Sequence, residues 1–265
     1  MRADHQPSFC GIAIMAKASR AGLTKTRLSP PLSLEDAALC NTAFLRDVAE
    51  NLLRAGSAAS LAGYVAYGPA GTESFFRTHL PQEIGLLETW FPDFGLCLCR
   101  AIEAQLALGH QAACVLNSDS PTLPSAFLAE AASVLAAPGD RIVLGPSTDG
   151  GYYLLGCKRI HPRLFEDIAW STEAVARQTL ERAAELGLAV HMLPAWYDVD
   201  DAASLRMARR EVLDGVGFHP RIASSPARNT AELFGRLGLD EDNARHLPPA
   251  PASFGDTVLS ALTAR

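Results

Sequence analysis

Two stretches of this sequence place carboxylates where they could bind a metal ion. Asn117-Ser118-Asp119-Ser120-Pro121 follows an apolar run, and Asp198, Asp200 and Asp201 follow a second run. Mg²⁺ takes hard oxygen ligands, typically one or two protein carboxylates completed by phosphates and water. If the chain is extended there, Asp198 and Asp200 point the same way, and such like charges require a cation or a raised pKa. The local alternatives are an Asx turn or helix cap at Asp119 and a helix-dipole partner at Asp201.

A basic segment near the start of the chain could supply the opposite charge. Lys17, Arg20, Lys25 and Arg27 fall within eleven residues, together with Gly22. Cationic side chains and exposed backbone N–H groups of this kind neutralise a di- or triphosphate. The segment matches neither the Walker A loop nor the dinucleotide-binding glycine pattern. A solvated basic loop explains the charges equally well.

A third group of residues could contact a sugar or a ribose. Asp149-Gly150-Gly151 predicts a tight hairpin turn between two strands. Its bare backbone would also let a sugar approach, with Asp149 accepting hydrogen bonds from hydroxyls or acting as a base. Trp170-Ser171-Thr172 offers a stacking face and two hydroxyl groups, or only a packing residue and a helix cap.

Alternating strands and helices must position these segments. Short apolar runs, typical of strands buried on both faces, alternate with stretches of helical periodicity, as in βαβ units. The pattern predicts an α/β fold, a mostly parallel sheet with helices on both faces, in which ligands bind beyond the carboxyl ends of the strands. Strands are expected at 9–16, 61–67, 84–90, 112–116, 141–144, 152–156 and 188–193, and helices at 33–55, 71–80, 94–109, 121–137, 171–186, 201–214 and 230–237.

The organisation of the chain predicts one catalytic domain and a short extension. We assign residues 1–215 to the domain and 216–265 to a C-terminal extension of open role, with a second, weaker helical pattern at 257–264. The extension is expected to pack loosely on the domain or to serve self-association, and a homodimer is considered.

The bulk composition narrows the class of protein. The formal charge of −6 argues against a nucleic-acid partner, because phosphate backbones are met by clustered Lys and Arg. The six cysteines form no CxxC pair, which indicates a reduced, cytoplasmic protein with inert thiols. No apolar stretch approaches the roughly 18 residues of a membrane span.

In this order and spacing the motifs resemble a bacterial family of GT-A-type nucleotide-diphospho-sugar transferases, glycosyltransferases of which some are linked to arsenosugar biosynthesis. The similarity covers residues 8–215 and extends to small nucleotidyltransferases such as the phospholactate guanylyltransferases, which share the Lys-Thr-Arg-Leu loop. The residues that carry it are Lys17, Lys25-Thr-Arg27-Leu28, Ser118-Asp119-Ser120-Pro121, Gly145-Pro146, Asp149-Gly-Gly-Tyr-Tyr-Leu-Leu-Gly156, Leu164-Phe165-Glu-Asp-Ile-Ala-Trp170-Ser171-Thr172 and Tyr197-Asp198-Val199-Asp200.

The resemblance implies a role for each part of the site. Mg²⁺ or Mn²⁺ would be bound by Asp119 and Asp200, with Asp198 beside them, and Asp119, Asp149 and Lys25 would be catalytic. The expected phosphate-binding residues are Lys17, Arg20, Gly22, Lys25, Arg27 and Ser118, and the expected substrate residues are Asp149, Gly150, Gly151, Trp170, Ser171 and Thr172.

Two segments depart from the family pattern. Arg20-Ala21-Gly22 lacks the usual proline before the glycine, and Pro92–Cys99 replaces a more polar Gly-Asp-Leu-Gly-Glu-Arg-like segment.

Three functions follow from these residues. The leading hypothesis is metal-dependent glycosyl transfer from a nucleotide-sugar to a small-molecule acceptor. The alternative is a nucleotidyltransferase that joins a nucleoside triphosphate to a phosphorylated small molecule and releases pyrophosphate. The third, motivated by the altered 92–99 segment, is a nucleotide-binding protein with impaired catalysis.

Overall fold

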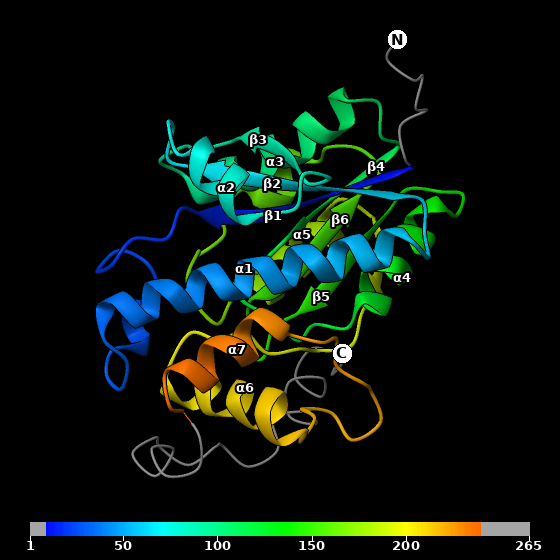
Figure 1. Cartoon of the computed structure of the whole chain (residues 1–265). Helices are drawn as coiled ribbons and strands as arrows, with labels where there is room; N and C mark the ends of the chain where they lie inside the picture. Colours follow the sequence, from blue (N-terminus) through cyan, green and yellow to red (C-terminus); the bar gives the residue numbers. More distant parts are fainter. Residues whose placement is uncertain (1–8, 240–265) are drawn as a thin grey trace.

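The computed structural model describes residues 9–239 and is built on a seven-stranded sheet (Figure 1). The strand order is β3-β2-β1-β4-β6-β5-β7, and every neighbouring pair is parallel except those of β6, which runs antiparallel to β4 and β5. The strands are β1 (Cys10–Lys17), β2 (Leu61–Gly68), β3 (Gly85–Glu88), β4 (Ala112–Leu116), β5 (Arg141–Pro146), β6 (Tyr152–Cys157) and β7 (Ala189–Met192).

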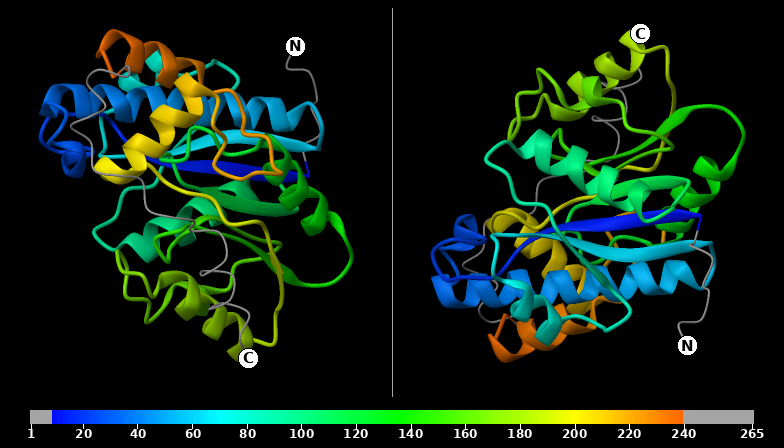
Figure 2. Two further views of the ribbon diagram at one scale, coloured as in Figure 1. Left: turned by 90° about the horizontal axis from the view of Figure 1, so that it is seen from below. Right: turned by 90° about the horizontal axis from the view of Figure 1, so that it is seen from above.

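Helices cover both faces of the sheet, with α1 and α7 on one side and α3 and α5 on the other (Figure 2). The central strand β1 shows why two layers form, because Ile12 and Ile14 are buried in one core cluster and Ala13 in the other. Successive side chains of a strand point to opposite faces, so an apolar run needs cover on both. The helices are α1 (Leu34–Gly56), α2 (Glu73–His79), α3 (Phe94–Ala107), α4 (Ser125–Ala136), α5 (Val175–Glu185), α6 (Ala202–Asp214) and α7 (Arg228–Arg236), with 3-10 turns η1 (Thr26–Leu28) and η2 (Pro162–Phe165).

The expected fold class is confirmed, and every expected strand and helix within residues 9–239 occurs with small boundary shifts. The largest shifts are at α4 and α5, which begin four residues later than the helical pattern suggested. Pro124 forms the cap of α4, and a turn with Ser171 at a φ of 65° precedes α5. The weak helical pattern at 257–264 lies outside the described residues.

Two local expectations can also be compared with the structure. Ser33 caps α1, because its hydroxyl accepts a hydrogen bond from the backbone N–H of Asp36 and donates one to its carboxylate. All six cysteines are free thiols and buried, as expected of inert side chains. No helix within residues 9–239 is long and apolar enough to cross a membrane.

Helix α7, from the expected extension, is docked on α1 through a buried carboxylate. Asp47 of α1 is fully buried and accepts hydrogen bonds from the backbone N–H groups of Asn229 and Thr230 at 3.0 and 2.8 Å. The side chains of the same two residues donate to it at 2.8 and 2.6 Å. The partial positive charge of a helix N-terminus stabilises such an anion. Phe44 and Phe234 meet edge to face beside it, so α7 is anchored by both polar and apolar contacts.

Replacing Asp47 by Ala should therefore destabilise the whole domain by roughly 2–4 kcal/mol, because it leaves buried donors of α7 without their acceptor. Urea unfolding followed by circular dichroism measures the change. Arg46→Ala, at the exposed neighbouring position of the same helix, is the control and should unfold with the wild-type midpoint. An Asp47→Ala midpoint equal to that of the control would show that α7 unfolds independently.

Candidate active site

A cleft of about 1110 Å³ opens at the carboxyl edge of the sheet. It is bounded by the exits of β1, β2, β3 and β4, by the β5–β6 hairpin and by the segment before α6. Arg20, Gly22 and Gly150 lie outside its lining. The sequence-predicted residues that line it are Lys17, Lys25, Arg27, Ser118, Asp119, Asp149, Gly151, Trp170, Ser171, Thr172, Asp198 and Asp200.

The segment carrying Asp198 and Asp200 is bonded between the exits of β4 and β5. The backbone N–H of Val199 donates to the carbonyl of Asp119 at 2.8 Å, and the Ser120 hydroxyl donates to the carbonyl of Tyr197 at 2.9 Å. On the other side, the N–H of Trp196 donates to the carbonyl of Pro146 at 3.1 Å. These bonds bring acids that are distant in the sequence to the same strand exit.

Lys25 lies between the two carboxylates expected to bind metal. Its Nζ is 2.7 Å from Oδ1 of Asp119 and 2.6 Å from Oδ1 of Asp200, and it also donates to the carbonyl of Val199 at 2.8 Å. Its side chain is only 4% exposed. Burial by itself lowers the pKa of Lys25, but the charges of Asp119 and Asp200 outweigh this and raise the pKa overall. The ammonium group is therefore a fixed positive charge at the centre of the acidic site.

The backbone of Lys25 is strained, and a second, solvent-exposed cation lies beside Asp200. Lys25 has a φ of 53°, in the left-handed region that costs a non-glycine residue free energy and is common at functional sites. Arg27 follows in η1, and its exposed guanidinium lies 2.7 Å from Oδ2 of Asp200. Asp200 thus binds a buried and an exposed cation at once.

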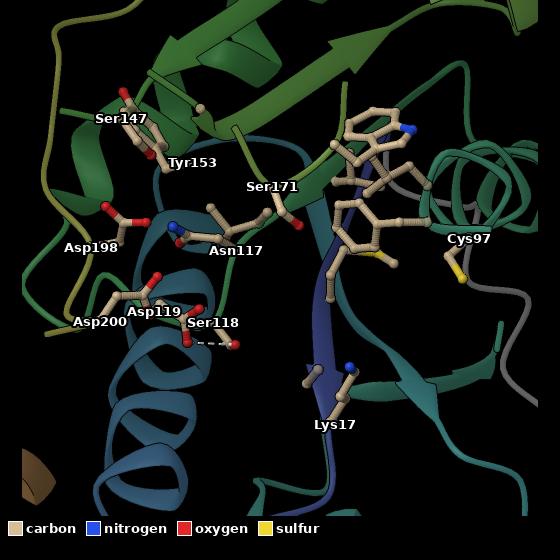
Figure 3. A pocket seen from close by; sticks show the side chains of 18 of the residues that line it. Lys17, Cys97, Asn117, Ser118, Asp119, Ser147, Tyr153, Ser171, Asp198 and Asp200 are labelled. Atoms are coloured by element: carbon tan, nitrogen blue, oxygen red, sulfur yellow. Dashed lines mark hydrogen bonds between the residues drawn. The ribbon is translucent and has the colours of Figure 1, made fainter. Parts of the chain in front are cut away.

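Asp198 lacks comparable compensation. Burial, followed by the negative charges of Asp149, Asp200 and Asp119, raises the pKa of Asp198 to about 8. Asp198, Asp200 and Asp119 gather on one side of the cleft, beside Asn117 (Figure 3). Four carboxylates therefore share a region in which Lys25 and Arg27 supply two positive charges.

The donor chemistry of this site fits a divalent cation. Carboxylate oxygens are the hard ligands that Mg²⁺ and Mn²⁺ accept. Among residues 9–239, however, no group of three or more acidic, His or Cys side chains is already arranged around one metal position. Phosphate oxygens would have to complete the ligand set, and the ion would compete with Lys25 for Asp119 and Asp200.

Asp201, the third acid of the 198–201 segment, has a structural role at the start of a helix. Asp201 caps α6, because its carboxylate accepts a hydrogen bond from the backbone N–H of Ser204 at 2.8 Å. The Ser204 hydroxyl in turn accepts a hydrogen bond from the backbone N–H of Asp201. The expected place of Asp201 at a helix N-terminus is therefore confirmed, while Asp198 and Asp200 line the cleft.

The Asp-Gly-Gly turn joins β5 and β6 as the hairpin interpretation predicted, and it also borders the cleft. Asp149 accepts the N–H of Gly151 at 2.8 Å, which holds the carboxylate over the turn. Gly150 has a φ of 91°, and a Cβ there would lie 2.2 Å from the carbonyl oxygen of Glu173. Its bare backbone lets the 171–175 segment pack on the hairpin, which positions Ser171 at the cleft.

Several cleft residues were not assigned a role from the sequence. Trp90 and Phe94 are 43% and 50% exposed, and Trp90 packs near Lys17 with its ring centroid 4.8 Å from Nζ. Among residues 9–239, the buried Thr89 Oγ1 and Asn117 Oδ1 have no hydrogen-bond partner. Their places just after β3 and β4 could have indicated them, because the exits of β1 to β4 all contribute to the cleft.

Comparison with known proteins agrees with this architecture. Residues 51–172 match the model of a family described as an uncharacterized protein conserved in bacteria (DUF2064). A protein from Desulfovibrio desulfuricans G20, named a "putative nucleotide-diphospho-sugar transferase", superposes with a TM-score of 0.73 at 24% identity, covering 88% of this chain and 96% of its own. The fold is that of the nucleotide-diphospho-sugar transferases.

A second solved structure shares the fold more distantly. It is a CMP:2-keto-3-deoxy-manno-octonic acid synthetase in complex with CTP, with a TM-score of 0.51 at 13% identity, covering 79% of this chain and all of its own. No curated protein matches the chain in sequence.

The raised pKa of Asp198 makes stability depend on pH. Between the ordinary value of 3.8 and about 8, the folded protein holds a proton that the unfolded chain releases. The free energy of unfolding should therefore fall as pH rises through this window, by at most about 1.4 kcal/mol per pH unit, and level off above it. Asp198→Asn removes this contribution, so its stability relative to wild type should increase with pH up to about 8.

Urea unfolding of both proteins from pH 5 to pH 9 tests this. Glu181→Gln, an isosteric change at an exposed position of α5, is the control and should track wild type throughout. A constant difference between Asp198→Asn and wild type would mean that Asp198 is ionised across the range.

Proposed function

We propose that the protein transfers a glycosyl group from a nucleotide-sugar donor to a small-molecule acceptor, with the help of Mg²⁺ or Mn²⁺. The observation that carries this proposal is the meeting of Asp119 and Asp200 at one cationic centre, with Nζ of Lys25 at 2.7 and 2.6 Å from their carboxylates. This centre lies in a cleft at the carboxyl edge of the sheet, where α/β proteins bind their ligands.

Asp119 and Asp200, with Asp198 beside them, would hold the metal ion, which supplies positive charge to the leaving diphosphate. Lys17, Lys25, Arg27 and Ser118 line the same cleft and would bind the phosphate oxygens. Charge stabilisation of this kind usually provides most of the catalysis in such reactions. Arg20 and Gly22 would act through the shape of the loop, because the N–H groups of Leu23 and Thr24 both donate to the carbonyl of Arg20.

In the transfer step, the acceptor hydroxyl oxygen forms a bond to the anomeric carbon while the bond from that carbon to the diphosphate breaks. The hydroxyl proton passes to a base, and the exposed carboxylate of Asp149 is our candidate. Gly151, Trp170, Ser171 and Thr172 line the same cleft as Asp149 and would contact the sugar or acceptor, whereas Gly150 would position that wall.

Removing the Asp119 carboxylate tests the metal assignment. Asp119→Asn keeps the size of the side chain, yet Mn²⁺-dependent binding of UDP-glucose or GDP-mannose should weaken at least about tenfold, since even outer-shell metal contacts contribute that much. Isothermal titration calorimetry with and without Mn²⁺ measures the change. Glu181→Gln removes one exposed charge elsewhere and should bind like wild type. Metal-dependent binding that survives in Asp119→Asn would refute the assignment.

Lys25 provides a second test, because its ammonium competes with the metal. Without metal, Lys25→Met leaves two partly buried carboxylates without their shared cation and should lower stability by roughly 3 kcal/mol. The same variant should bind free Mn²⁺ more tightly than wild type. Its melting temperature should therefore rise more than that of wild type when Mn²⁺ is added. Electron paramagnetic resonance and thermal unfolding report these quantities.

Lys17→Met is the matched control for Lys25→Met. Lys17 lines the cleft but contacts the Trp90 ring rather than the acid pair. Its Mn²⁺ affinity should equal that of wild type. If Mn²⁺ affinity is unchanged in Lys25→Met as well, the metal does not bind between Asp119 and Asp200.

The number of cations in the cleft favours one alternative function. Lys17, Lys25 and Arg27 would suit a triphosphate, and hence a nucleotidyltransferase that releases pyrophosphate. Thermal stabilisation by UDP- or GDP-sugars would support glycosyl transfer, whereas stabilisation by GTP or CTP with a phosphorylated acid would support the alternative. Turnover with any of these donors would contradict the third hypothesis, a nucleotide-binding protein with impaired catalysis.

A further inference from the structure

We propose that Trp90, Thr89 and Lys17 form a subsite that stacks and recognises the nucleobase of the ligand, with a preference for bases that carry carbonyl oxygens. The inference rests on the proposed function in one respect, namely that the ligand is a nucleotide. It concerns the half of the cleft away from the acid cluster, and it adds Trp90 and Thr89, which have no part in the phosphate chemistry, to Lys17, which would lie between base and phosphates.

Three neighbouring strand exits build this subsite. Lys17 ends β1 and pairs in register with Gly68 at the end of β2, and Trp90 follows β3, which pairs with β2. The sheet order therefore places Lys17, Gly68 and Trp90 side by side at the carboxyl edge, all on the β3 side of the cleft.

The Trp90 ring is held in place rather than free on the surface. A Cβ added to Gly68 would lie 2.2 Å from Cε3 of Trp90, so the ring rests directly on the backbone of Gly68. The ammonium of Lys17 lies 4.8 Å from the ring centroid, in cation–π contact. Despite these contacts 43% of Trp90 remains exposed, and it lines the cleft. A pre-positioned aromatic surface binds a planar ring at little entropic cost.

Thr89 adds an observation that points to a ligand. Its side chain is 5% exposed and lines the cleft, yet its Oγ1 has no hydrogen-bond partner among residues 9–239. A buried hydroxyl without a partner costs free energy, and it can both donate and accept a hydrogen bond. Next to an exposed tryptophan, it suits the polar edge of a ring whose face lies on Trp90.

The dimensions of the sheet connect this subsite with the acid cluster. From β3 to β4 the sheet order passes three strand spacings, about 14 Å in all, which is within reach of an extended nucleoside diphosphate. A base on Trp90 thus places its diphosphate toward Asp119 and Lys25.

The charge of Lys17 indicates which bases fit. An ammonium group only donates hydrogen bonds, so it favours O4 of uracil or O6 of guanine over the amino group that adenine carries at C6. The alternative ligand for this subsite is an acceptor substrate with an apolar group. Such a substrate would form no hydrogen bond with Lys17 or with the Thr89 hydroxyl.

Calorimetry on the full chain with Mn²⁺ separates the base subsite from the phosphate site. The probes are UDP, ADP and inorganic pyrophosphate. Trp90→Ala should weaken UDP about 10–100-fold, the usual contribution of one stacked base, while pyrophosphate affinity stays within about twofold of wild type. Trp90→Phe should restore most of the loss, and Lys17→Met should reduce the preference for UDP over ADP.

Tryptophan fluorescence gives a second measurement that does not depend on turnover. UDP stacked on Trp90 should quench the emission of the wild-type protein, and this quenching should disappear in Trp90→Phe. Trp170→Phe, which removes the other cleft tryptophan, is the matched control and should retain it.

The outcomes distinguish the two proposals. If wild type binds pyrophosphate with Mn²⁺ but Trp90→Ala leaves UDP affinity unchanged, or lowers UDP and pyrophosphate equally, the base subsite is wrong and the phosphate site stands. If an apolar acceptor analogue but not UDP loses affinity in Trp90→Ala, the wall belongs to the acceptor. If wild type binds none of the probes, both proposals fail.

Discussion

The buried ammonium of Lys25 is the interaction on which the carboxyl edge of this sheet depends. It lies within 2.7 Å of one carboxylate from the β4 exit and one from the segment before α6, and it also bonds the carbonyl of Val199. These groups come from parts of the chain that local structure does not hold together. A charge as buried as this one requires partners, because desolvation without pairing costs several kcal/mol. The hydrogen bonds of the 196–199 segment bring the acids together, and the charges of the acids hold Lys25 between them.

The same ion pair explains the electrostatic character of the site. Asp119 and Asp200 share one cation, whereas Asp198 retains a raised pKa because the neighbouring carboxylates and its burial are not offset. A protein can leave such an imbalance only where a ligand or a metal ion corrects it, or where a proton does so in the meantime. The imbalance lies in the cleft rather than in the core.

The two sides of the cleft are built from different parts of the sheet. On one side, β1, β2 and β3 end in Lys17, Gly68 and the residues up to Trp90, a surface of aromatic and cationic groups. On the other side, the turn of the β5–β6 hairpin lies at this edge, and its Gly150 packs against Glu173 of the 171–175 segment. Because β6 is antiparallel to β5, it starts at the carboxyl edge, whereas a strand parallel to β5 would have started at the opposite edge.

The sequence by itself determined the fold class, the order of strands and helices along the chain, and twelve of the residues that line the cleft, because apolar periodicity and residues after strands are local signals. It also indicated two roles for the 198–201 segment, metal binding and a charge at a helix N-terminus, and Asp201 has the second. Only the tertiary structure decided that Lys25 would lie between the acids, that Gly150 serves the packing of the chain, and that Trp90 and Thr89 border the cleft. These depend on strand order and on contacts between distant segments, which residue spacing alone does not encode.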